Sequence, residues 1–118
     1  MNAHIYLNLF HILFVAPFFI YVGVMKSALP AGVFTALIVL GAILVFYHGY
    51  KFVVRMMKGS GYAWVNAVHA LLVGPLLLYI GLKGAETERP YYEALLLTAF
   101  AALGYHLYEM VVYRDFYL

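Results

Sequence analysis

The sequence contains no cysteine and few charged side chains, since only 10% of its 118 residues are Asp, Glu, Lys or Arg. The absence of cysteine excludes disulfides, thiolate metal ligands and cysteine nucleophiles, and leaves the redox compartment open. About a quarter of the residues are charged in an ordinary soluble domain, so the shortage of charge excludes a water-soluble surface. A net charge of +2 is too small and too dispersed to indicate nucleic-acid binding.

Carboxylates are especially scarce, with five Asp and Glu in the whole chain. This number is too small for a di-iron site of the ferritin kind, which requires several carboxylates. No set of residues resembles a serine or aspartate hydrolytic site. The sequence thus contains no catalytic motif, which leans against an enzyme but leaves the question open.

Hydrophobic residues are abundant, at 67% of the chain with a mean hydropathy of +0.93. They form four continuous apolar spans, at about residues 4–25, 31–57, 62–82 and 91–113. Each reaches the roughly 20 residues that a helix needs to cross about 30 Å of hydrocarbon, and none alternates as barrel strands do. We expect an all-α integral membrane four-helix bundle, multi-pass in a lipid bilayer, with residues 1–118 forming a single domain.

The connections between the spans are short, so consecutive helices should be antiparallel neighbours. The side that carries the N-terminus, the second connection and the C-terminus has four basic residues, and the opposite side has three. The first set is Lys51, Arg55, Lys58 and Arg114, and the second is Lys26, Lys83 and Arg89. Because cytoplasmic segments carry the excess of Lys and Arg, we expect both termini to be cytoplasmic.

The chain also repeats itself with an offset of 58 positions, which divides it into repeat 1 (residues 1–58) and repeat 2 (residues 59–118). In the first block, Asn8, His11, Leu13, Val15, Pro17, Tyr21 and Gly23 return as Asn66, His69, Leu71, Val73, Pro75, Tyr79 and Gly81. In the second, Tyr47, His48, Tyr50, Val53 and Val54 return as Tyr105, His106, Tyr108, Val111 and Val112. Each repeat has two spans, so both helical hairpins enter the membrane from the same side. We therefore expect a pseudo-two-fold axis along the membrane normal.

Each span contains one histidine that the repeat preserves. His11 and His69 lie near the starts of their helices, and His48 and His106 lie near the ends of theirs. In antiparallel helices the start of one adjoins the end of the next. We therefore expect all four imidazoles in one leaflet, about 10 Å below the surface.

Further polar residues share the helix faces of these histidines. Each lies three positions from a histidine, and the set is Asn8, Asn66, Lys51 and Glu109. Lys51 and Glu109 are repeat counterparts of opposite charge, which would allow an ion pair. Ionisable groups inside membrane spans usually face the bundle interior, although side chains this shallow can also reach the interface.

Four imidazoles in a bundle are typical of cofactor or metal ligation. Two histidines can provide both axial ligands of haem b, and three or four suit zinc or copper. Asn8, Asn66, Lys51 and Glu109 would then lie in the surroundings of the ligands, where hydrogen bonds orient imidazoles.

Two alternatives remain open. A histidine ring beside a Lys–Glu pair could relay protons or ions, with the chain lining a pore as a homo-oligomer. The opposite leaflet, however, offers only Tyr21, Tyr79 and Thr98 as interior polar groups. In the second alternative, the polar layer only fixes helix packing.

Proline and glycine mark the same repeat positions. Pro17 and Pro75 leave the carbonyls of Leu13 and Leu71 without their helical donors, so we expect helix kinks there. Gly23 and Gly81 are expected to assist helix packing.

Two of these patterns also carry a resemblance. The blocks His69-x5-Pro75-x3-Tyr79-x-Gly81 and Tyr105-His106-x-Tyr108 resemble short uncharacterised membrane proteins of large DNA viruses of protists. Such proteins often consist of one hairpin, so the resemblance implies a fused pair of hairpins in a membrane. It implies no particular activity. The spacing of the histidines is also similar, in geometry alone, to that of di-histidine membrane cytochromes.

Overall fold

The computed structural model describes residues 3–112, which are helical apart from short connections, and this part of the chain contains no strand. Its first half comprises α1 (Ala3–Phe10), η1 (His11–Val15), α2 (Ala16–Met25), η2 (Lys26–Ala28) and α3 (Ala31–Met57). Its second half comprises α4 (Ala63–Val68), η3 (His69–Val73), α5 (Gly74–Lys83), η4 (Gly84–Glu86) and α6 (Arg89–Val112). Tyr113 and Arg114 lie outside the described residues.

Four continuous helices are long and apolar enough to cross a membrane: Ala3–Ala28, Ala31–Met57, Ala63–Glu86 and Arg89–Val112. Within residues 3–112 the all-helical class and the four apolar helices of membrane-spanning length expected from the sequence are confirmed. Much of the helix surface consists of large apolar side chains, such as Phe46, Leu97 and Val111. This composition is compatible with a multi-pass membrane protein.

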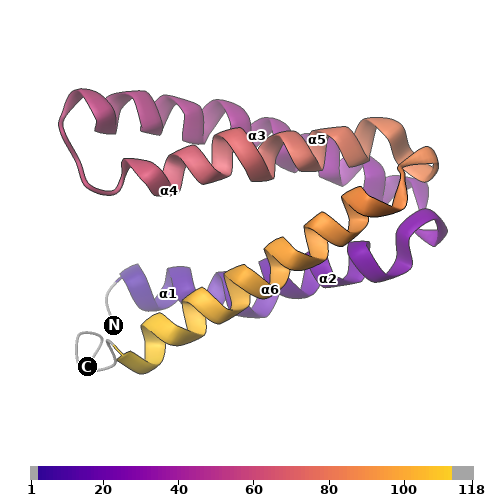
Figure 1. The fold of residues 1–118 in the computed structure, drawn as a ribbon, viewed down its shortest axis with the longest axis horizontal. Coiled ribbons are helices and arrows are strands. Elements are labelled where there is room, and N and C mark those ends of the chain that lie inside the picture. The colour runs from indigo at the N-terminus through magenta and orange to yellow at the C-terminus, as the bar shows by residue number, and fades with distance from the viewer. Residues whose placement is uncertain (1–2, 113–118) are drawn as a thin grey trace. The chain divides into compact units, whose positions relative to one another are not determined.

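The helices form two compact units. The terminal unit contains residues 1–26 and 92–118, of which 3–26 and 92–112 are described, and the central unit contains residues 27–91. In the central unit, α3 runs antiparallel along α4 and α5 (Figure 1). In the terminal unit, α6 accompanies α1 and α2 (Figure 1). Each unit therefore joins one span of repeat 1 to one span of repeat 2.

The core of the terminal unit is formed by α2 and α6. Buried apolar side chains come from both helices: Ala16, Phe19 and Val22 from α2, and Tyr92, Leu95 and Ala99 from α6. At Gly23 the helices approach so closely that an added Cβ would lie 2.5 Å from Leu96 Cγ and 3.1 Å from the Tyr92 carbonyl oxygen. Glycine is required there while Leu96 faces it, because an added side chain would overlap this leucine.

The core of the central unit uses the same repeat positions. Leu77 and Ile80 of α5 are buried with Phe34 and Leu37 of α3. These four are the counterparts of Phe19, Val22, Tyr92 and Leu95 in the terminal unit. A Cβ added at Gly81 would lie 2.6 Å from Ile38 Cγ1 and 2.8 Å from the Phe34 carbonyl oxygen, which repeats the contact of Gly23. The packing role expected for Gly23 and Gly81 agrees with these contacts.

Both N-terminal spans of the repeats contain a π turn just before their proline. The backbone N–H of Ala16 donates to the His11 carbonyl, and that of Gly74 donates to the His69 carbonyl, so the bonded residues are five apart. Proline has no N–H to donate and its ring crowds the preceding turn, which the wider π turn relieves. The kinks expected at Pro17 and Pro75 stay predictions, whereas the π turns were not foreseen.

Candidate functional site

The four repeated histidines form two stacked pairs. In the terminal unit, the ring centroids of His11 and His106 lie 4.3 Å apart with an angle of 20° between the planes. In the central unit, those of His48 and His69 lie 4.6 Å apart, also at 20°. Every pair takes one histidine from each repeat, because each unit joins one span from each.

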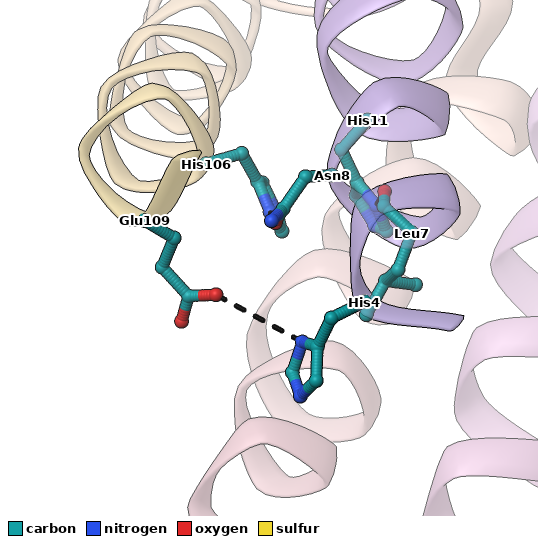
Figure 2. A network of polar contacts seen from close by, with 6 residues as sticks. All are labelled: His4, Leu7, Asn8, His11, His106 and Glu109. Atoms are coloured by element: carbon teal, nitrogen blue, oxygen red, sulfur yellow. Dashed lines mark hydrogen bonds and ion pairs between the residues drawn. The ribbon is translucent and has the colours of Figure 1, made fainter. Parts of the chain in front are cut away.

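A buried asparagine holds one imidazole in each pair. In the terminal unit, Asn8 Oδ1 lies 2.7 Å from His106 Nδ1, and Figure 2 shows the two side chains pointing toward each other from α1 and α6. In the central unit, Asn66 Nδ2 lies 2.9 Å from His48 Nδ1. Asn8 is 0% exposed and Asn66 is 2% exposed. A buried amide costs free energy unless it is hydrogen-bonded, so these contacts fix both the amide and the imidazole.

The other imidazole of each pair is held by its own helix. His11 Nδ1 lies 2.8 Å from the Leu7 carbonyl oxygen, and His69 Nδ1 lies 2.6 Å from that of Val65. A carbonyl oxygen only accepts hydrogen bonds, so Nδ1 must carry the hydrogen in both rings. The neutral ring then carries its lone pair on Nε2.

The surroundings of the two pairs differ in charge. In the central unit, Arg55 Nη1 donates to Asn66 Oδ1 over 2.7 Å. In the terminal unit, Glu109 Oε2 lies 3.9 Å from His4 Nδ1, a contact that becomes an ion pair when His4 is protonated (Figure 2). The repeat counterparts of His4 and Glu109 are Tyr62 and Lys51. A carboxylate thus lies three residues along the chain from His106 in the terminal unit, whereas in the central unit a guanidinium is hydrogen-bonded to the asparagine of the pair.

The expectation that the repeated histidines and asparagines lie together is met within each unit, one pair at a time. The structure brings His11 to His106 and His48 to His69, each pair with its asparagine. A common site for all four histidines stays a prediction. Lys51 and Glu109 belong to different units, so their ion pair also stays a prediction.

Arg55 is a site residue that sequence reasoning missed, since it was considered only for membrane orientation. It lies seven residues, or two helical turns, after His48, and this spacing puts both on one face of α3. That spacing is the signal that could have identified it.

The imidazole pairs are the candidate metal ligands of the described residues. Within residues 3–112, no three side chains of His, Cys, Asp or Glu converge on one ion position. Each stacked pair brings two imidazoles together, so any ion bound by a pair would take its other ligands from water or small molecules.

A separate polar contact lies at the other end of the central unit. The Tyr79 hydroxyl donates to Glu88 Oε2 over 2.8 Å, and its ring lies 4.2 Å from that of Tyr91. This hydrogen bond, and the nearby positive charge of Lys83, lower the pKa of Glu88 below its ordinary value of 4.5. In the terminal unit, the Thr98 hydroxyl donates to the Ala94 carbonyl within α6. Tyr79 and Thr98 are therefore engaged locally, which does not favour their role in a conduction path.

Comparison of the chain with protein-family models, curated proteins and solved structures gives no match. Its function is therefore argued from the chemistry of the two histidine pairs.

Proposed function

We propose that this chain is an integral membrane protein that binds a transition-metal ion through Nε2 of its paired histidines. The observation that carries the proposal is the Nδ1–H donation of His11 and His69 to backbone carbonyls. Metal-ligating histidines are oriented in this way, because a hydrogen bond at one ring nitrogen holds the lone pair of the other toward the ion. Imidazole ligands suit zinc and copper.

The proximity of the two imidazoles in each pair is what supports their sharing one ion. Zinc–nitrogen bonds are about 2.0–2.1 Å long, so two nitrogens in a tetrahedral site lie about 3.3–3.5 Å apart. Ring centroids at 4.3 and 4.6 Å put the two imidazoles of each pair close enough to share an ion. Their planes lie only 20° from parallel, so one ring must turn before both in-plane Nε2 lone pairs can meet at that ion.

Haem b fits this geometry less well. Its two axial imidazoles must bind the iron from opposite faces of the porphyrin, which places them end to end. The rings of each pair lie face to face instead, so haem would require a pair to separate. A metal ion requires one ring to turn, but no porphyrin has to fit between the rings.

The membrane topology belongs to the same proposal. The four helices span a bilayer, with both termini cytoplasmic, and the repeats are related by a pseudo-two-fold axis along the membrane normal. The equivalent cores and histidine pairs support this relation, because each contact recurs 58 positions away. A fused pair of hairpins, as the resemblance to viral membrane proteins implies, would produce the same equivalence.

The test is the metal content of the full chain, purified in mild detergent, loaded with zinc or copper and washed. We expect bound metal in the wild type and its loss when the histidine ligands are replaced, beginning with His11→Ala. Thr98→Ala is the control, because its hydroxyl bonds only within its own helix among the contacts described.

Other results would favour the alternatives. Metal-free, colourless protein that stays folded after the histidine substitutions would support a purely structural polar layer. A Soret band lost with the histidines would favour haem. Proton flux into liposomes that is abolished by His48→Ala or His106→Ala would favour conduction.

A further inference from the structure

Arg55 determines the orientation of the Asn66 amide. A guanidinium has only donors, so the atom of Asn66 that faces it must be the oxygen. The amide nitrogen Nδ2 is consequently the atom that faces His48 and donates to its Nδ1. His48 Nδ1 must then hold the lone pair, and the hydrogen of the neutral ring is on Nε2.

The terminal unit has the opposite arrangement. Asn8 directs its oxygen toward His106, and an amide oxygen only accepts, so His106 Nδ1 carries the hydrogen. His11 Nδ1 carries a hydrogen as well, since it donates to the Leu7 carbonyl. Both rings of the terminal pair therefore have their lone pair on Nε2. In the central pair only His69 does.

We infer that the terminal pair, His11 and His106, is the metal site of this chain, and that Arg55 prevents the central pair from acting as a second one. The inference rests on the proposed metal binding and states which half of the duplication performs it. The central pair then serves to hold α3 against α4 and η3.

The charged side chains around the two pairs also favour a bound cation at the terminal pair over the central pair. Arg55 lies one hydrogen-bonded amide away from the central pair, and Lys51 follows His48 by one helical turn. In the terminal unit, the counterpart of Lys51 is Glu109, which follows His106 by one turn and approaches His4. A bound cation is favoured near a carboxylate and disfavoured near a guanidinium.

The first experiment titrates the metal-depleted full chain in detergent with zinc chloride and measures the number of ions bound. We expect one zinc per chain in the wild type. Replacing either terminal histidine (His11→Ala or His106→Ala) should abolish this binding, whereas His48→Ala and His69→Ala should retain it.

The second experiment restores the central site. In Arg55→Met, the Asn66 amide can rotate and present its oxygen to His48, which would then carry its hydrogen on Nδ1. We expect the number of bound zinc ions to rise from one to two. Lys58→Met is the matched control, because it removes the same charge from the end of α3 without a contact to Asn66, and it should leave the number at one.

A third measurement needs no substitution. Nitrogen-15 spectra of the histidine rings distinguish Nδ1–H from Nε2–H in the metal-free wild type. We expect Nε2–H for His48 and Nδ1–H for the other three histidines of the pairs.

The outcomes separate this inference from the proposed function. Two zinc ions in the wild type, loss of zinc in His69→Ala alone, or Nδ1–H at His48 would overturn the inference and leave metal binding intact. A single zinc in folded Arg55→Met would overturn the role of Arg55. Absence of zinc binding to every variant, with the His48 tautomer as expected, would refute the proposed function.

Discussion

At the scale of single residues, the asparagines are as informative as the histidines. An imidazole has two nitrogens, and the partner of one decides which of them carries the hydrogen. Asn8 and Asn66 occupy equivalent positions and contact equivalent histidines, yet they present different atoms to them. One guanidinium, that of Arg55, accounts for the difference on the central side. A small change in hydrogen bonding thus distinguishes two nearly identical sites.

The first prediction concerns Asn8. Asn8→Leu keeps a similar volume but removes the acceptor that holds His106, so we expect zinc affinity to fall about 10–100-fold, as for other partners of metal-ligating histidines. A competition titration against a zinc-sensitive dye measures the change. Asn66→Leu is the matched control, and an equal loss of affinity in that variant would contradict the assignment of the site to the terminal pair.

The second prediction concerns Glu88, which lies between two spans. Its pKa is lowered mainly by the hydrogen bond from Tyr79. A carboxyl whose pKa is lowered in the folded state stabilises that state above its unfolded pKa. This contribution is lost as the pH falls below 4.5 and through the lowered pKa.

Tyr79→Phe removes the donor, so we expect the pKa of Glu88 to rise toward its ordinary value of 4.5. Carbon-13 spectra of the Glu88 carboxyl, recorded from about pH 6 down to pH 2, measure it. An unchanged titration in Tyr79→Phe would show that the hydrogen bond does not lower this pKa.

At the scale of helices, π turns and glycines determine how each helix packs against its neighbour. The π turns accommodate Pro17 and Pro75, and each begins at a histidine of the pairs. Extra residues in a turn change the direction of the side chains that follow, and π turns are frequent at functional sites. Glycines then allow the helices of a unit to approach closely, and their positions determine where α3 meets α5.

The third prediction compares two glycines of α3. A Cβ at Gly41 would lie 2.9 Å from the Leu78 backbone nitrogen and 3.0 Å from the Gly74 carbonyl oxygen, whereas one at Gly49 would meet nothing within 4 Å. Because backbone atoms cannot move aside cheaply, we expect Gly41→Ala to destabilise the fold by about 1–3 kcal/mol.

Gly49→Ala should be neutral or slightly stabilising, because alanine favours helices more than glycine does. Unfolding of the two variants by sodium dodecyl sulfate in mixed micelles measures the difference. Equal stability of the two variants would contradict the close contact at Gly41.

At the scale of the whole molecule, the two compact units do not coincide with the two sequence repeats. A span of repeat 1 packs with a span of repeat 2 in each unit, so neither repeat contains a complete histidine pair. Two separate hairpins could form such contacts only between molecules, whereas here they lie within one chain. Within one chain the two copies of the site can differ, and His4, Lys51, Arg55 and Glu109 do differ from their repeat counterparts.

The fourth prediction tests this pairing with cysteines, which the natural chain lacks. A Cβ at position 23 would lie 2.5 Å from Leu96 Cγ, which is compatible with the Cβ separation of about 3.5–4.5 Å in a disulfide. We expect Gly23→Cys with Leu96→Cys to form an intramolecular disulfide.

The control is Gly23→Cys with Ile38→Cys, the pair that would cross-link if both spans of repeat 1 packed together in the same register. We expect no disulfide there, because Leu96 occupies the space beside position 23. Electrophoresis under non-reducing conditions, with heavy-isotope mass spectrometry of the linked peptides, distinguishes the two results.

The sequence by itself determined the helical class, the four spans and the repeat. These features follow from hydrophobic runs and residue spacing, which are local properties of the chain. It also identified the histidines and asparagines, because their preservation at an offset of 58 positions is visible without coordinates.

Only the tertiary structure decided which histidine meets which. Equivalent helices of a duplicated chain can pack within a repeat or between repeats, and both arrangements satisfy the same apolar pattern. The direction of the Asn66 amide depends likewise on Arg55, through a bond made when α3 and α4 come together. Such choices depend on contacts between distant residues, and no local pattern contains them.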